Sequence, residues 1–310
     1  MQLHITNGDA VLYLFRKGGL PGTQLAWRDA LHEGPVFADC SLEELSVARA
    51  RYLGDAGYGN PIKLNYDFEK RDAVMKTASM FDEIVLWFEH DLYDQLQLLQ
   101  LLDYFAREDT MPGWVQLVQS DSYLGMLEPT ELLAFLPKRR PISSDTFSFA
   151  QRAWKAFAAP SPLEFNGLRA EVPSGLPFVR AAIERLCEEF PSAENGLSRT
   201  QMQILDSAAR GVGRKEELFR VSQSREEAAY LGDTVFYKYV DELVNSPSAL
   251  LMETAGSYAP TLLGSRVLNG DADWLETRPI DRWIGGVHLT AKTQWRWDAH
   301  AKTLIERTHR

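Results

Sequence analysis

Residues 83–88, with the sequence EIVLWF, form a short and almost uninterrupted apolar run. A strand of a parallel sheet is covered by helices on both faces, so its sequence is continuously apolar instead of alternating. The segment therefore predicts a strand in the centre of a mostly parallel sheet.

Strand and helix patterns alternate around this segment. Further strands are predicted at 2–6, 24–27 and 114–118, helices at 41–53, 66–80, 92–105 and 128–136, and either a helix or a strand at 10–16. Ser41 and Glu44 form the capping box that begins the helix at 41–53. This alternation predicts an α/β domain over residues 1–140, with a mostly parallel sheet and flanking helices.

The chain beyond residue 140 has a mainly helical pattern. Two helices, 143–157 and 176–190, are predicted to form a helical bridge over 141–196. A turn-rich stretch at 191–196, followed by a capping box at Ser198 and Gln201, predicts a domain boundary near 196. Three helices (199–210, 215–221 and 224–244) and a hairpin (248–260) then follow in the order of a winged-helix domain. Residues 197–310 are thus predicted to form a winged-helix-like domain with a Trp- and Arg-rich tail.

The charge of the chain differs between these two parts. The net charge is −10, and residues 197–310 carry equal numbers of basic and acidic side chains, so all of it lies in the first 196 residues. Phosphate backbones require clustered Lys and Arg, which neither part offers, and Glu226 and Glu227 lie early in the third helix of the predicted winged-helix-like domain. Nucleic acid is therefore not an expected partner. A scaffold or partner-docking domain is favoured over a DNA-binding one.

The chain has only two cysteines, Cys40 and Cys187, and its start lacks a secretory pattern. No apolar run reaches the roughly 18 residues of a membrane span. We expect a soluble cytoplasmic protein without a membrane partner.

Polar and mostly acidic side chains follow each predicted strand. They are Asn7, Gly8 and Asp9 after the first strand, Arg28, Asp29, His32 and Glu33 after the second, Glu89, His90, Asp91 and Asp94 after the third, and Ser120 and Asp121 after the fourth. Ligands of open parallel sheets bind beyond the carboxyl ends of the strands. The sequence therefore predicts an acidic cleft that binds a small molecule at this end of the sheet.

Glu89, Asp91 and Asp94 are the predicted metal ligands. Alternate residues leaving a strand point the same way, and Asp91 and Asp94 share a helical face. Oxygen ligands in this number suit Mg²⁺ or Mn²⁺, whereas participation of His90 or His32 would make Zn²⁺ or iron possible. The alternative is that acidic residues at a helix start are favoured by the helix dipole and bind nothing.

The other polar residues at the strand ends are candidates for catalysis or ligand binding. Asp9, His32, His90 and Asp121 are the candidate catalytic residues, and Asn7, Gly8, Arg28 and Asp29 are the candidate ligand-binding residues. Free N–H groups at the helix start after Gly8 would hold a phosphate or carboxylate, although Asn7 or Asp9 would also serve as a simple cap. Asp29 follows Asp9 at the spacing of a ribose-binding acid, but no GxGxxG pattern accompanies it, so a nicotinamide cofactor is disfavoured. GxSxG and HExxH patterns are also absent from the sequence.

The tail has an unusual composition, with DRWIGGVHL at 281–289 and WRWD at 295–298. Arg282 and His288 are candidate ligand-binding residues if the tail reaches the acidic cleft. The alternative is a strand pair that closes its own domain core. The tryptophans at 283, 295 and 297 each bury about 200 Å² when covered, so we expect the tail to pack against the first domain.

Three separated motifs resemble the bacterial family called domain of unknown function 1835. They are LHITNGDA at 3–10, WRDALHEGP at 27–35 and VLWFEHDLYDQLQLLQLL at 85–102, and the resemblance covers roughly residues 1–140. GLSRTQMQIL at 196–205, together with the tail motifs, is similar to the region that commonly accompanies this family. The family is uncharacterised, so the resemblance implies no activity and no site residues.

These observations favour a metal-dependent hydrolase or transferase acting on a phosphate-bearing or nucleotide-like small molecule. The alternatives are a ligand-sensing regulatory protein with a winged-helix-like docking domain, and a purely structural adaptor.

Overall fold

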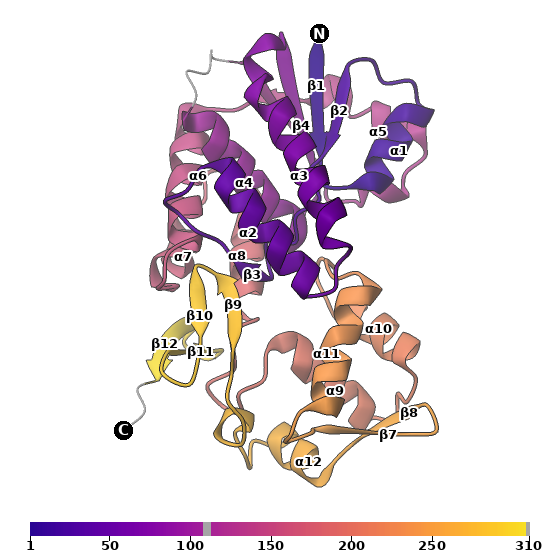
Figure 1. Cartoon of the computed structure of the whole chain (residues 1–310), viewed down its shortest axis with the longest axis vertical. Coiled ribbons are helices and arrows are strands. Elements are labelled where there is room, and N and C mark those ends of the chain that lie inside the picture. Colours follow the sequence, from indigo (N-terminus) through magenta and orange to yellow (C-terminus); the bar gives the residue numbers. More distant parts are fainter. Residues whose placement is uncertain (108–112, 308–310) are drawn as a thin grey trace. The chain divides into compact units, whose positions relative to one another are not determined.

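The computed structural model of the chain describes residues 1–107 and 113–307 (Figure 1). They form two compact units. Unit 1 comprises Met1–Ile183 and Gly285–Val287, and unit 2 comprises Glu184–Ile284 and His288–Arg310. The boundary near 196 and the helical bridge over 141–196 describe a different division, and both stay predictions.

Unit 1 contains a five-stranded sheet in the order β2-β1-β4-β5-β6. Figure 1 labels β1, β2 and β4 of this sheet. The strands are β1 (Gln2–Thr6), β2 (Thr23–Ala26), β4 (Glu83–Phe88), β5 (Val115–Gln119) and β6 (Arg140–Pro141). The first four strands pair in parallel, and β6 is antiparallel to β5. The EIVLWF segment is the central strand of the sheet, as its apolar sequence predicts, and its residues 84–88 are fully buried. The mostly parallel α/β sheet is confirmed.

The helices of this part of the chain follow the predicted order. They are α1 (Asp9–Lys17), α2 (Leu42–Asp55), α3 (Pro61–Lys76), α4 (Leu92–Arg107), α5 (Pro129–Leu133), α6 (Ser144–Phe157), α7 (Leu163–Gly167) and α8 (Val179–Cys187). The segment 10–16, which fits either state in the sequence, is helical. The predicted capping box of Ser41 and Glu44 begins α2, because each side chain satisfies the other's backbone N–H.

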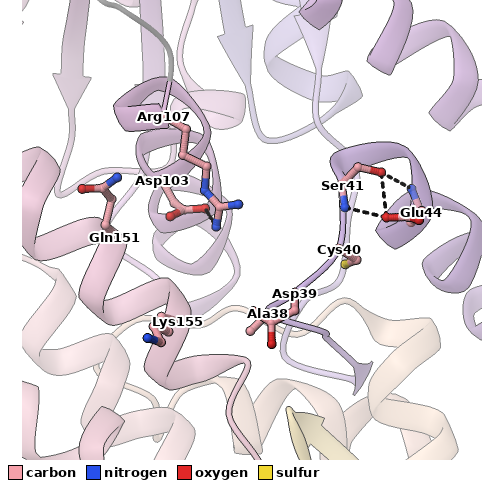
Figure 2. A pocket seen from close by; sticks show the side chains of 9 residues that line it. All are labelled: Ala38, Asp39, Cys40, Ser41, Glu44, Asp103, Arg107, Gln151 and Lys155. Atoms are coloured by element: carbon pink, nitrogen blue, oxygen red, sulfur yellow. Dashed lines mark hydrogen bonds and ion pairs between the residues drawn. The ribbon is translucent and has the colours of Figure 1, made fainter.

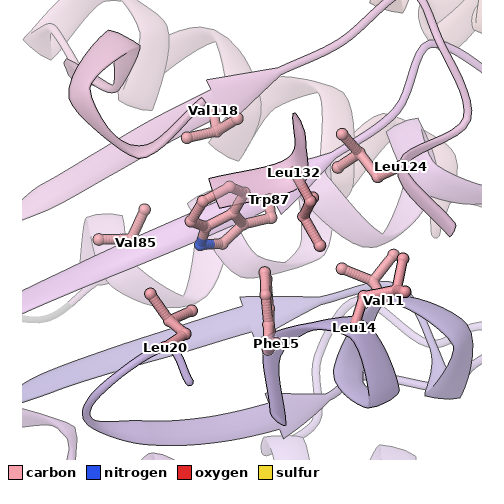
Figure 3. Close-up of a cluster of buried hydrophobic side chains, with 9 residues drawn as sticks. All are labelled: Val11, Leu14, Phe15, Leu20, Val85, Trp87, Val118, Leu124 and Leu132. Carbon is pink, nitrogen blue, oxygen red and sulfur yellow. The ribbon is translucent and has the colours of Figure 1, made fainter. Parts of the chain in front are cut away.

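Alternate residues of β4 pack on opposite faces of the sheet. Val85 and Trp87 join Phe15 of α1 and Leu132 of α5 in one apolar cluster (Figure 3). The rings of Phe15 and Trp87 meet edge to face, with centroids 4.9 Å apart. Helix α4 packs against β4 as well. Since β1 connects to β2 in one direction along the sheet and β4 connects to β5 in the other, right-handed crossovers place α1 and α4 on opposite faces.

Unit 2 is mainly helical with small sheets. It contains α9 (Arg199–Ala209), α10 (Lys215–Gln223), α11 (Asp233–Asn245), the hairpin of β7 (Leu251–Thr254) and β8 (Ser257–Pro260), and α12 (Leu262–Leu268). The capping box of Ser198 and Gln201 is present. The third helix begins at Asp233 instead of 224. Glu226 and Glu227 lie in the non-helical segment before it, where they pair with Arg185 and Arg199. The winged-helix arrangement itself stays a prediction.

The tail folds as β9 (Arg282–Gly285), β10 (Val287–Leu289), β11 (Gln294–Asp298) and β12 (Thr303–Arg307). Trp295 and Trp297 are buried in β11, which pairs antiparallel with β12. The short segment 285–287 belongs to unit 1, where Gly286 N–H donates to the Phe157 carbonyl. Only glycine fits at 286, since a Cβ there would lie 2.0 Å from the Ala158 carbonyl oxygen.

Within residues 1–107 and 113–307, no helix is both long enough and apolar enough to cross a lipid bilayer.

Candidate metal centre

The strand order of the sheet contains a topological switch point between β1 and β4. The chain leaves β1 toward β2 and leaves β4 toward β5, so the connections diverge at the carboxyl ends of these neighbouring strands. Thr6 at the end of β1 lies level with Trp87 of β4, which places Asn7 beside the segment after Phe88. Open α/β sheets bind their ligands at this kind of crevice.

Glu89, Asp91 and Asp94 bring three carboxylates together at the switch point. One oxygen from each lies within 4.8 Å of the others, and all three side chains are buried. Glu89 directly follows β4, Asp91 precedes the first turn of α4, and Asp94 lies three residues further along this helix. The short spacing of these three residues, from the end of β4 into the first turn of α4, therefore brings their carboxylates together, as the sequence predicts.

Hydrogen bonds from four different segments hold the three carboxylates. Asp94 accepts from the Asn7 side-chain amide at 2.7 Å and from the Glu89 N–H at 2.6 Å. The Asp94 N–H donates to Asp91 at 3.1 Å, so Asp91 caps α4. Glu89 Oε1 accepts from the N–H of Leu124, the first residue of η2 (Leu124–Met126), at 2.7 Å. These donors fix the orientation of every carboxylate.

Within residues 1–107 and 113–307, no cationic side chain neutralises this group. Among the residues that the structure describes, none of the three carboxylates forms an ion pair with Lys, Arg or His. Buried carboxylates are normally paired with a cation or bound to a metal, because an isolated buried charge is costly. The group therefore has a deficit of positive charge.

The pKa values report the same deficit. Burial, with repulsion from Glu89, raises the pKa of Asp91 to about 7. Burial and the two neighbouring carboxylates raise the pKa of Asp94 well above its usual range, and burial raises that of Glu89. Raised pKa values in a group of neighbouring carboxyl groups are frequent at functional sites.

The start of α1 lies one residue from Asn7. Gly8 is the N-cap residue of α1, and no side chain caps the helix. A Cβ at Gly8 would have no neighbour within 4 Å. Asp9 is exposed and pairs with Arg28 at 2.6 Å, and this hydrogen bond lowers the pKa of Asp9. Asp9 is thus engaged with Arg28 and is not a member of the carboxylate group.

Asp29 and His32 are buried in a different environment. Asp29 pairs with the fully buried Arg49 at 2.8 Å, and Arg49 also donates to backbone carbonyls, including that of Glu33 at 2.6 Å. The His32 ring packs 6.1 Å from the ring of Tyr93. These contacts tie the segment after β2 to α2, which is a structural role for Asp29.

His90 lies between two of the three acids in sequence, and its ring packs among aromatic residues. The ring centroid lies 5.1 Å from that of Tyr123 and 5.9 Å from that of Phe178. Burial lowers the pKa of His90, while the exposed Asp121 acts in the opposite direction. His90 Nδ1 is buried and has no hydrogen-bond partner within the described parts of the chain.

The two candidates from the tail make their described contacts within unit 2. Arg282 donates to the Tyr239 hydroxyl at 2.6 Å and to Glu189 at 3.3 Å. His288 lies 2.6 Å from Asp281 and stacks on Trp283, with ring centroids 4.2 Å apart.

The backbone groups that hold Glu89 are not evident from the sequence. The N–H groups of Leu124 and Gly125 both point at this carboxylate, and Gln95 donates to the Glu89 carbonyl. The turn-forming residues that follow β5 are the one signal that such backbone donors leave in a sequence.

No model of a known protein family matches the chain, and no curated protein sequence is similar to it. The resemblance to the domain of unknown function 1835 therefore depends on its motifs alone.

Proposed function

We propose that unit 1 is a metal-dependent hydrolase or transferase that acts on a phosphate-bearing small molecule. The observation that carries this proposal is the group of three buried carboxylates at the switch point without a cationic partner. A divalent cation supplies the missing positive charge, and the donors around each acid keep its oxygens in place.

The donor set favours Mg²⁺ or Mn²⁺. The described cation-binding group consists of carboxylates only and includes no histidine or cysteine, which zinc and iron sites commonly use. Oxygens bound to one Mg²⁺ lie about 3 to 4 Å apart. The three carboxylate oxygens, which lie within 4.8 Å of one another, would draw closer to form half of an octahedral shell. Water and substrate oxygens complete such a shell.

The uncapped start of α1 is the proposed phosphate-binding element. Its N–H groups have no side-chain acceptor, and Gly8 leaves open space beside them. Helix N-termini attract phosphate through these N–H groups and the helix dipole. Arg28, fixed by Asp9, adds a guanidinium group near this start.

His90 is the proposed proton-transfer residue, because its Nδ1 atom is buried and has no hydrogen-bond partner among the residues that the structure describes. In hydrolysis, a water oxygen forms a bond to phosphorus and gives up a proton to His90. The bond to the leaving oxygen breaks, and that oxygen takes up a proton.

Thermal unfolding of the full chain with Mg²⁺, Mn²⁺ or Ca²⁺ tests the cation site. We expect Mg²⁺ or Mn²⁺ to raise the melting temperature of the wild type, and we expect no rise in Glu89→Gln or Asp91→Asn. Both variants keep the oxygen that accepts a described backbone N–H. Asp121→Asn, which alters an exposed acid outside the group, is the matched control. A wild type with no cation-dependent rise would contradict the cation site.

Phosphate release from a panel of nucleotides and sugar phosphates, with and without Mn²⁺, tests the reaction. Metal-dependent release that His90→Gln reduces supports the proposed enzyme. Metal-dependent nucleotide binding without any turnover supports the regulatory alternative instead.

A further inference from the structure

Unit 1 contains a second place where a small molecule fits. A cavity of about 590 Å³ lies between the segment 38–41, which leads into α2, and the facing sides of α4 and α6 (Figure 2). Ligand-binding cavities in proteins commonly measure about 300 to 1,000 Å³. The cavity is lined by none of the residues of the candidate metal centre.

A second cavity with apolar lining lies next to this one. This smaller adjoining cavity shares Cys40, Ser41, Asp103 and Arg107 with it and is lined by apolar side chains as well, including Leu42, Leu45 and Trp154. Leu45 and Trp154 are buried. An occupant that extends from the larger cavity into the smaller one would therefore contact both polar and apolar side chains.

The charged side chains of the lining are not equally available to a ligand. Arg107 pairs with Asp103 at 2.8 Å. Glu44 is engaged by Ser41 in the capping box of α2 (Figure 2). Asp39 and Lys155 form no ion pair within the described chain, and both are exposed.

Asp39 and Lys155 belong to opposite sides of the cavity. Lys155 projects from α6, whereas Asp39 lies on the segment before α2 (Figure 2). A ligand that satisfies both needs a positive group at one end and a negative group at the other.

We propose that this cavity binds a small zwitterion of the amino-acid or short-peptide class with an apolar side chain. The carboxylate of the ligand faces Lys155, with Arg107 beside it, and the ammonium group faces Asp39. The apolar side chain extends into the smaller adjoining cavity, toward Leu45 and Trp154. This site is independent of the metal-dependent reaction proposed above.

Cys40 provides a direct reporter of occupancy. It lines the cavity, is half-buried and is free, whereas the other cysteine, Cys187, is buried in unit 2. Alkylation by iodoacetamide, followed by mass spectrometry of the Cys40 peptide, therefore measures access to the cavity. A bound ligand slows this alkylation.

The experiment uses the full chain and three forms of one dipeptide at millimolar concentration. We expect L-leucyl-L-leucine to slow alkylation of Cys40, and we expect its N-acetyl amide, which carries no charge, to have little effect. N-acetyl-L-leucyl-L-leucine, which keeps only the carboxylate, should protect less than the free dipeptide.

Variants of the two unpaired residues test the charge assignment. Asp39→Asn and Lys155→Met should each raise the dissociation constant about two- to fivefold, the effect of losing one partly exposed ion pair. Arg152→Met is the matched control, because Arg152 lies on the same helix, pairs with Glu171 and does not line the cavity.

Three results would overturn the proposal. They are an absence of protection by the free dipeptide, equal protection by the uncharged form, and equal protection by the form with only a carboxylate. The last result would assign the cavity to simple anions.

Discussion

His4 makes the stability of unit 1 depend on pH in a defined direction. It lies in the middle of β1 and is completely buried, and its Nδ1 accepts a hydrogen bond from Trp87 Nε1 at 3.2 Å. Burial, the largest effect, lowers the pKa of His4 from 6.5 to about 4. A protonated ring would also lose the acceptor that Trp87 uses. The folded chain therefore keeps His4 neutral under conditions where the unfolded chain protonates it.

The size and sign of the effect follow from proton linkage. Between about pH 6.5 and pH 4 the unfolded chain binds more protons at this position, so stability falls as the pH falls through this range. At about pH 4.5 the unfolded state gains about 2 to 3 kcal/mol from protonating His4 that the folded state does not gain. Above about pH 7 the contribution is complete and constant.

The variant His4→Asn isolates this contribution, since its side-chain oxygen can accept the Trp87 hydrogen bond without titrating. We expect the wild type to lose about 2 to 3 kcal/mol more than His4→Asn when both are taken from about pH 7.5 to about pH 4.5. Comparing the two losses cancels the contributions of all other groups, including the carboxylates at the switch point, and any constant cost of the substitution.

Native-state hydrogen exchange of the β1 and β4 amides is the appropriate measurement, because it reports the unfolding free energy of the unit that contains His4. His300→Asn, at an exposed position of unit 2, controls for the loss of one histidine. Equal losses in the wild type and His4→Asn would refute the reasoning, since His4 would then not differ between the folded and unfolded states.

Three further predictions concern other parts of the molecule. Burial raises the pKa of Asp91 to about 7, so the metal-free protein loses stability as the pH rises through that value. Asp91→Asn should therefore raise the melting temperature of the metal-free protein at about pH 8 by about 3 to 6 °C. Arg49→Met should lower the free energy of unfolding in urea by about 3 to 5 kcal/mol, because the buried Asp29 loses its cationic partner. Adding Asp29→Asn should recover part of that loss. Gly286→Ala should lower the free energy of unfolding by more than about 2 kcal/mol in the same assay, because its Cβ would meet a backbone carbonyl. Gly167→Ala, at an open helical position, should not lower it. Equal effects of the two substitutions would contradict the steric reason.

The local pattern of the sequence is sufficient to predict β1, β2, β4, β5 and most helices of unit 1, but it does not predict the two-residue strand β6. Each element has its own signature, such as the apolar run of β4 and the capping box of α2. The grouping of Glu89, Asp91 and Asp94 was predictable for the same reason, because all three lie within six residues and follow one strand.

Contacts between distant segments were not predictable in the same way. Asp9 was expected to lie with Glu89 and Asp91, but it pairs with Arg28, whose left-handed backbone conformation (φ 56°) is invisible in the sequence. Asp29 was a candidate for ligand binding, and its pairing with Arg49 depends on how α2 packs. The switch point itself requires β1 to pair with β4, a choice of partner that strand sequences alone do not encode.

The placement of residues 285–287 in unit 1 has a consequence for how this chain is made. During synthesis, domains generally fold as their residues leave the ribosome, with the N-terminal part first. Here the Phe157 carbonyl and the Val36 N–H acquire their partners, Gly286 and Gly285, only after about a hundred residues beyond Ile183 have been added. Unit 1 emerges first but cannot form all of its contacts until residues 285–287 have been synthesised. A chain that ends before residue 285 would lack residues of both units.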